Sequence, residues 1–149
     1  MNFRQKVYAE YLALIQEKIA ELRQTLDDLK ESSSNETKST AGDKHETALA
    51  MLQIEQKNTS QQLKEALDKK ILFEQLNLNP STTAIDRGSL VKTSRGYLFV
   101  SLALGKIVFD GITILAISPQ SPIGQKLLGL QVNGSATVNG LEYIIESIY

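Results

Sequence analysis

The sequence predicts an α+β protein, in which an N-terminal antiparallel coiled-coil helical hairpin precedes a small antiparallel β domain with one short helix. A change in composition after residue 76 is the first indication. Residues 1–76 hold most of the charged residues and only one glycine, Gly42, whereas residues 77–149 hold the other glycines and all three prolines. Charged, glycine-poor sequence is typical of long helices, and glycine-punctuated, β-branched sequence is typical of short strands and turns.

The second indication is a pair of apolar seams spaced alternately by four and three residues. The first seam is uninterrupted and consists of Tyr8, Leu12, Ile15, Ile19, Leu22, Leu26 and Leu29. At about 1.5 Å per residue it spans roughly 32 Å. The second contains more polar residues and consists of His45, Leu49, Leu52, Gln56, Thr59, Leu63 and Ala66. Such spacing indicates coiled-coil packing, and a connector of about a dozen residues favours a hairpin within one chain. Pairing of the helices between two chains stays open as an alternative.

The period is lost in residues 30–36, which are polar, and residues 77–87 form a predicted linker in which Pro80 stops the preceding helix. In the β domain, residues 88–149, we expect strands over 88–93, 97–104, 107–109, 112–118, 136–138 and 141–148, with Gly105-Lys106 as a hairpin-like turn. A short helix is predicted by Ser121 as N-cap, Pro122 at its first position and Gly129 at its end. A domain of this size is marginally stable alone, so we expect it to pack on the base of the hairpin.

Two acidic residues, Asp43 and Glu46, stand three residues apart where the second helix is predicted to start. At that spacing two carboxylates can lie on one helix face and share a cation or a proton. The same pair also fits an N-cap and a capping box, so stabilisation of the helix start is the alternative interpretation. The lone His45 between them has no second histidine or cysteine to complete a transition-metal site.

Composition excludes several classes of function. The formal net charge is −1 and cysteine is absent, which gives no bias toward nucleic acid and no disulfide or thiolate metal site. The N-terminus leads into a charged helix, and no apolar run reaches the ~18 residues of a membrane span. We expect a soluble, cytoplasmic protein. No phosphate-binding loop, nucleophile triad or dinucleotide motif is present in the sequence.

Three features resemble the Gre transcript-cleavage factors of bacterial RNA polymerase, GreA and GreB. The order of hairpin and small domain is the same. The block Ser121-Pro122-Ile123-Gly124, followed by a short helix ending Leu-Leu-Gly, is similar to the family's signature, and Gly42-Asp43-Lys44-His45-Glu46 is similar to its Gly-Asp-x-x-Glu tip. The resemblance covers nearly the whole chain and implies an FKBP-like fold for residues 88–149.

The resemblance implies a factor that is not an enzyme by itself. A Gre factor inserts its hairpin into the secondary channel of RNA polymerase, where two tip acids help to hold a catalytic Mg²⁺ near the 3′ end of backtracked RNA. Asp43 and Glu46 would fill those roles, and residues 121–124 would dock on the polymerase. The implied factor is monomeric and has no tightly bound cofactor and no membrane partner.

The sequence also departs from the family after the tip. The family has Asn-Ala-Glu-Tyr after its glutamate, whereas this chain has Thr47-Ala48-Leu49-Ala50. A factor that occupies the channel and modulates or inhibits the polymerase without stimulating cleavage therefore stays an alternative. So does a coiled-coil dimerisation protein unrelated to transcription. A prolyl isomerase, which the FKBP-like fold would allow, is not expected, because the domain is small and poor in aromatic residues.

Overall fold

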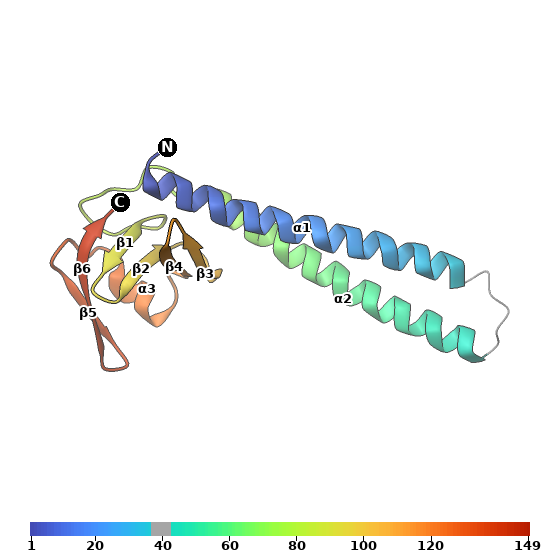
Figure 1. Ribbon diagram of the computed structural model, residues 1–149. Helices are drawn as coiled ribbons and strands as arrows, with labels where there is room; N and C mark the ends of the chain where they lie inside the picture. The colour runs from blue at the N-terminus through green and yellow to red at the C-terminus, as the bar shows by residue number, and fades with distance from the viewer. Residues whose placement is uncertain (37–42) are drawn as a thin grey trace. The chain divides into compact units, whose positions relative to one another are not determined.

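The computed structural model describes residues 1–36 and 43–149, and it confirms the predicted α+β class (Figure 1). Two long helices precede a six-stranded sheet that is interrupted by one short helix. The elements in chain order are α1 (Phe3–Glu36), α2 (Asp43–Glu74), β1 (Leu90–Thr93), β2 (Gly96–Val100), β3 (Gly105–Phe109), β4 (Ile112–Ile117), α3 (Pro122–Leu127), β5 (Ser135–Val138) and β6 (Leu141–Ile148).

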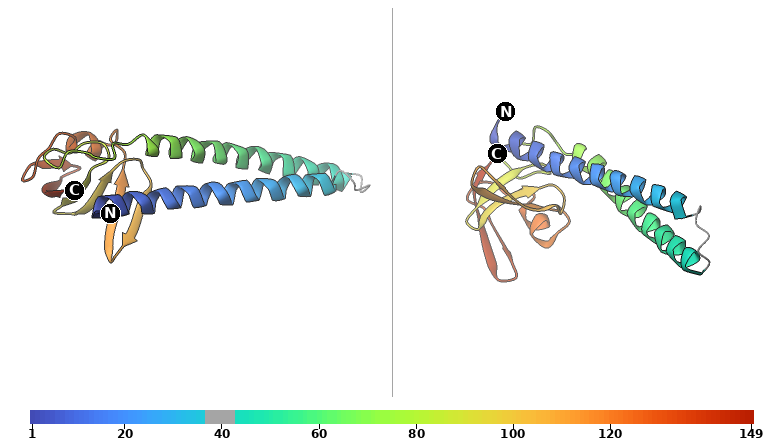
Figure 2. Two further views of the ribbon diagram at one scale, coloured as in Figure 1. Left: turned by 90° about the horizontal axis from the view of Figure 1, so that it is seen from above. Right: turned by 45° about the vertical axis from the view of Figure 1, so that its right-hand side comes forward.

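By its internal contacts the chain divides into two compact units: Leu12–Ile71, which is a helical hairpin, and Met1–Tyr11 together with Leu72–Tyr149. In the hairpin unit α1 and α2 run antiparallel and side by side (Figures 1 and 2). The seam positions are the ones withdrawn from solvent, and Ile15, Ile19, Leu22, Thr59 and Ala66 are buried. The predicted coiled-coil hairpin within one chain is therefore confirmed over the described residues. The side chain of His45 lies outside them.

The polar segment after Leu29 continues the helix. Residues 30–36 were expected to leave the helical pattern, but α1 extends to Glu36. Ser33 keeps the seam spacing, four residues after Leu29. The Gln56 side chain donates to the Leu29 carbonyl at 3.2 Å and to the Ser33 hydroxyl at 2.5 Å. A polar pair thus extends the apolar seam, which a search for apolar residues alone does not detect.

The sheet has the strand order β3-β4-β2-β1-β6-β5 and is mixed. Adjacent strands are antiparallel except β2 and β4, which are parallel and pair from Tyr97 with Ile114 to Val100 with Ile117. The expectation of a wholly antiparallel sheet was wrong on this point. The cause is the segment after Val100, which leaves the sheet so that β4 lies beside β2 and β3 takes the edge.

The hairpin turn was also placed wrongly. Gly105, at φ +81°, is the first residue of β3 and not part of a turn between β2 and β3. The turn lies instead at Asp110-Gly111, which joins the antiparallel strands β3 and β4. Both residues have positive φ, +49° and +76°, as a two-residue hairpin turn requires. The Asn139-Gly140 turn between β5 and β6 has the same geometry, with φ of +53° and +77°.

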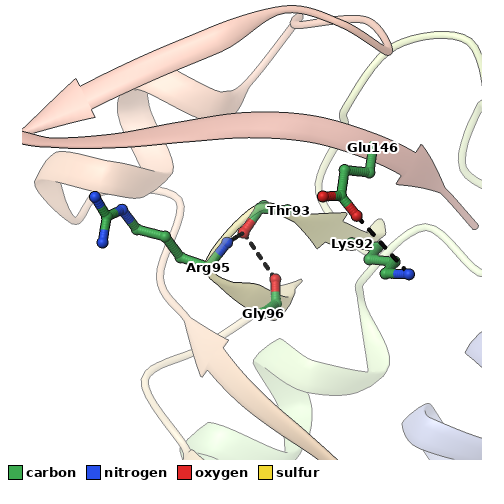
Figure 3. Close-up of polar contacts among 5 residues, drawn as sticks. All are labelled: Lys92, Thr93, Arg95, Gly96 and Glu146. Carbon is green, nitrogen blue, oxygen red and sulfur yellow. Dashed lines mark hydrogen bonds and ion pairs between the residues drawn. The ribbon is translucent and has the colours of Figure 1, made fainter.

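The turn between β1 and β2 is closed by one side chain (Figure 3). The Thr93 hydroxyl donates to the Gly96 carbonyl at 2.8 Å and accepts from the Arg95 backbone N–H at 3.1 Å. Beside it, Lys92 and Glu146 form an ion pair at 3.8 Å between the adjacent strands β1 and β6. Both side chains are 44% exposed, so this pair contributes little to stability.

The ends of the two long helices cover one face of the sheet. Tyr97 and Phe99 alternate along β2 and therefore share this face. Phe3 packs edge-on against Tyr97, and Tyr11 and Phe73 pack against Phe99, with ring centroids 5.8–6.1 Å apart. The Tyr11 hydroxyl lies 2.8 Å from the Gly105 carbonyl and 3.1 Å from the Ile114 carbonyl. The prediction that the β domain packs on the base of the hairpin helices is confirmed for these residues.

A second core forms around residues that alternate with these along the strands. Val91, Leu98, Val100 and Ile145 are buried there against Leu127 of α3. Ile85, in the predicted linker, joins this core, and its backbone exchanges hydrogen bonds with Gly129 and Leu130. The sheet is thus covered on both faces at β2, which explains why this strand is apolar from Tyr97 to Val100.

Candidate functional site

The two candidate tip acids lie in the first turn of α2. Asp43 is its first residue and Glu46 follows three positions later, so the helix places the two positions on one face. The Glu46 side chain is exposed, whereas the side chain of Asp43 lies outside the described residues. Negative charge at a helix N-terminus is favourable because the first N–H groups carry partial positive charge. The helix-start role and a metal-binding role are therefore both compatible with this placement.

A divalent cation would need more ligands than these two residues offer. Mg²⁺ prefers six oxygen ligands and usually keeps several waters when only one or two carboxylates bind it. Among the described residues, there is no group of three or more histidine, cysteine or acidic side chains that could hold a metal ion. Carboxylate oxygens suit Mg²⁺, but two carboxylates make only part of its coordination shell.

The block Ser121-Pro122-Ile123-Gly124 begins α3, as predicted. Ser121 is the N-cap, and its hydroxyl accepts from the Gly124 N–H at 3.1 Å and donates to the Ser118 carbonyl at 2.6 Å. Pro122 occupies the first helical position, where its missing N–H costs no hydrogen bond. Pro122 is exposed, and Ile123 packs against the core beneath α3.

Gly124 permits a close approach of two backbone segments. A Cβ at this position would overlap the Ser118 carbonyl oxygen and would lie 2.9 Å from the Pro119 Cα. Any larger residue would push the β4–α3 connection away from the helix. The structural demands of α3 therefore account for Ser121 and Gly124, and leave Pro122 as the block's exposed residue.

The structure also places together residues that sequence patterns did not single out. Arg4 is buried, and its guanidinium donates to the carbonyls of Gly88, Leu78 and Asn77 at 2.5, 2.9 and 2.6 Å. Burial lowers the pKa of Arg4, and Tyr8 partly offsets this. These bonds tie the loop after α2 to the start of α1. The sequence signal was weak, because an arginine near a helix start resembles any solvated charge.

A cleft of about 430 Å³ lies in the same unit. Its wall is formed by the end of α2 and the first residues after it, the turn at Asp86-Arg87, Ser101-Leu102 after β2 and Pro119-Gln120 after β4. No motif predicted this cleft, because the segments that line it are brought together by tertiary contacts, among them the parallel β2–β4 pairing.

Comparisons with known proteins do not assign the chain. No protein-family model matches it, and no curated protein matches it. Within residues 1–36 and 43–149, none of the helices is long and apolar enough to cross a membrane.

Proposed function

We propose that this protein is a Gre-like transcription elongation factor that binds bacterial RNA polymerase and inserts its helical hairpin into the secondary channel. The observation that carries the proposal is the start of α2 at Asp43, which places both candidate acids in the first turn of a hairpin helix, with Glu46 exposed. The resemblance of the hairpin order and of residues 121–124 to Gre factors supports it.

The chemistry of the two acids fits a supporting role at the polymerase active site. Carboxylate oxygens suit Mg²⁺, and a cation held by two sets of ligands can orient a water for attack on a phosphodiester. In the proposed complex Asp43 and Glu46 supply part of that coordination, and the polymerase supplies the remainder and the bound RNA 3′ end. The protein alone has no endonuclease activity in this account.

Docking is assigned to the surface of α3. Pro122 is exposed at its first position, whereas Ser121 and Gly124 hold the local backbone. We therefore expect Pro122→Ala to weaken polymerase binding while leaving the fold intact. Ser121→Ala and Gly124→Ala would weaken binding through loss of local structure, which a lowered Tm of the free protein would reveal.

Transcript cleavage in stalled complexes tests the proposal. The wild-type protein should release short 3′ RNA fragments from backtracked polymerase in the presence of Mg²⁺. Asp43→Asn and Glu46→Gln should each lower the cleavage rate by at least about tenfold, since each removes one anionic ligand. Glu55→Gln is the matched control, because Glu55 is also an exposed acid on α2 but lies more than two turns further along.

The outcomes separate the candidate functions. Binding to polymerase without fragment release would favour the channel-occupying modulator, which the change to Thr47-Ala48-Leu49 also favours. Absence of polymerase binding would reject both forms of the proposal. The pairing of both seams within one chain speaks against a coiled-coil dimerisation protein, because over the described residues these seams are already occupied.

A further inference from the structure

The cleft in the β domain lies where the two parallel strands end. Ser101-Leu102 directly follows β2, and Pro119-Gln120 follows β4 by two residues. Because parallel strands end at the same edge of a sheet, the connections that leave them diverge and open a crevice there. In open α/β sheets this edge is where ligands bind. Here a single parallel pair produces the same local geometry.

The cleft wall combines apolar side chains with amides. Leu72 is 53% exposed at the end of α2, and Leu76 and Leu102 are half-buried. Pro119, which also lines the cleft, is buried. A large, exposed leucine beside a concave surface favours an aliphatic side chain as its occupant.

The side-chain amides of the cleft wall have donor or acceptor groups that no described residue uses. The side chain of Gln75 makes no hydrogen bond with any described residue. Gln120 accepts from Ser118 through its carbonyl oxygen, which leaves its NH₂ group. Side-chain amides beside leucines can bond to the backbone of an extended peptide.

The cleft also has one cation without a partner. Over the described parts of the chain, the Arg87 guanidinium makes no hydrogen bond and no ion pair. The neighbouring Asp86 carboxylate accepts from the Arg87 backbone N–H at 2.7 Å. An arginine in the wall of a cleft can bind a carboxylate through two parallel hydrogen bonds.

We propose that this cleft binds an extended segment of a partner protein that carries an aliphatic residue next to an aspartate or glutamate. The aliphatic side chain lies between Leu72 and Leu102, and the carboxylate pairs with Arg87. The segment's backbone bonds to the free amides of the wall. The inference does not depend on the identity of the partner or on the proposed role at RNA polymerase.

Titration of the full-length ¹⁵N-labelled protein with two short peptides tests the inference. The probes are acetyl-Gly-Leu-Glu-Leu-Gly-amide and its counterpart with lysine in place of glutamate. The acidic peptide should shift the amide resonances of Gln75, Leu76, Leu102 and Gln120 at millimolar concentration. The lysine peptide should bind at least about fivefold more weakly, because it places a cation beside Arg87.

Two variants connect any binding to this cleft. Arg87→Gln should remove the preference for the acidic peptide, and Leu102→Ser should weaken both peptides. Arg23→Gln, an exposed arginine on α1 in the hairpin unit, should change neither. Equal binding of the two peptides, shifts confined to other surfaces, or an unchanged preference in Arg87→Gln would each overturn the proposal. Arg87 is exposed, so Arg87→Gln should keep the wild-type Tm, and its effect on the preference decides the proposal even if Leu102→Ser lowers the Tm.

Discussion

Arg4 shows how one residue can organise a loop that has no regular structure. Its guanidinium is buried, and among the described residues three backbone carbonyls near the end of α2 and the start of β1, rather than a carboxylate, satisfy its donors. Gly88, one of these partners, has φ +94°. A Cβ there would lie 2.6 Å from the Asn77 carbonyl oxygen and 3.1 Å from Nη2 of Arg4. The loop therefore depends on both residues.

Gly88→Ala should lower the free energy of unfolding by about 3 kcal/mol, because it combines a strained φ with a backbone clash. Gly111→Ala is the matched control. Gly111 has φ +76°, but no atom lies within 4 Å of its ideal Cβ, so only backbone strain of about 1 kcal/mol is expected. Urea unfolding followed by circular dichroism measures both. Equal losses in the two variants would show that the Asn77 contact has no role.

Tyr11 should make stability depend on pH in the alkaline range. Burial raises the pKa of its hydroxyl to about 12, from an ordinary value of 10. From pH 10 upward the unfolded chain loses this proton while the folded protein retains it, so stability falls until the folded pKa is passed. Below pH 10 the contribution is complete. Tyr11→Phe should be less stable at pH 7 by about 1 kcal/mol, because the Gly105 and Ile114 carbonyls lose a donor.

The pH test compares the two proteins across the same range. The difference in unfolding free energy between wild type and Tyr11→Phe should shrink between pH 10 and 12. Tyr8 and Tyr97 also have raised pKa values, mainly through burial, and remain in both proteins. Their effects cancel in the difference. A constant difference over this range would contradict the burial of the Tyr11 hydroxyl.

At the scale of elements, local patterns predicted the helices and missed the strand pairing. The heptad seam of α1 and the Ser121-Pro122 start of α3 follow from residues close in sequence. Helix α1 also has a second set of buried residues, Arg4, Val7 and Tyr11, which are not seam positions. Val7 and Tyr11 each come one residue before a seam residue, Tyr8 and Leu12. The spacing of this second set, three and four residues, is helical too, but Arg4 is charged and the partners lie more than 70 positions away, so the sequence does not indicate that the set is buried.

The parallel pairing of β2 with β4 could not be predicted from local sequence either. Asp110-Gly111 is a strong hairpin signal, and giving it more weight than Gly105-Lys106 would have placed β3 beside β4. Nothing local, however, shows that β4 lies beside β2. The cleft at the ends of these strands is therefore a product of tertiary structure. The positions of Asp43 and Glu46, by contrast, followed from helix boundaries that the sequence indicates.

Leu22→Ala tests the contribution of the seam. Leu22 is 6% exposed in the hairpin unit, so truncation should lower the free energy of unfolding by about 2–3 kcal/mol. Leu14→Ala is the control on the same helix, because Leu14 is 42% exposed and its truncation should cost well under 1 kcal/mol. Thermal unfolding monitored at 222 nm gives both values. Similar losses would mean that the seam is not the packed face of α1.

At the scale of the whole molecule, both seams are occupied within one chain. We therefore expect a monomer of 16.5 kDa in sedimentation equilibrium at micromolar concentrations. Polar substitution of Ile19 and Leu22 should destabilise this monomer without changing its mass. A dimer that dissociates on the same substitutions would instead favour helix pairing between chains and the dimerisation function.

The most direct test of the central claim uses the absence of cysteine in this chain. A single photo-crosslinking group can be attached through Ala50→Cys, an exposed α2 position one turn after Glu46. Matched labels at Ala20→Cys on α1 and at Val108→Cys on β3 serve as controls, since both positions are exposed. In backtracked RNA polymerase complexes, the account predicts crosslinks to the RNA 3′ end from Ala50→Cys and from neither control. Absence of RNA crosslinks at Ala50→Cys in a complex that still binds the protein would contradict it.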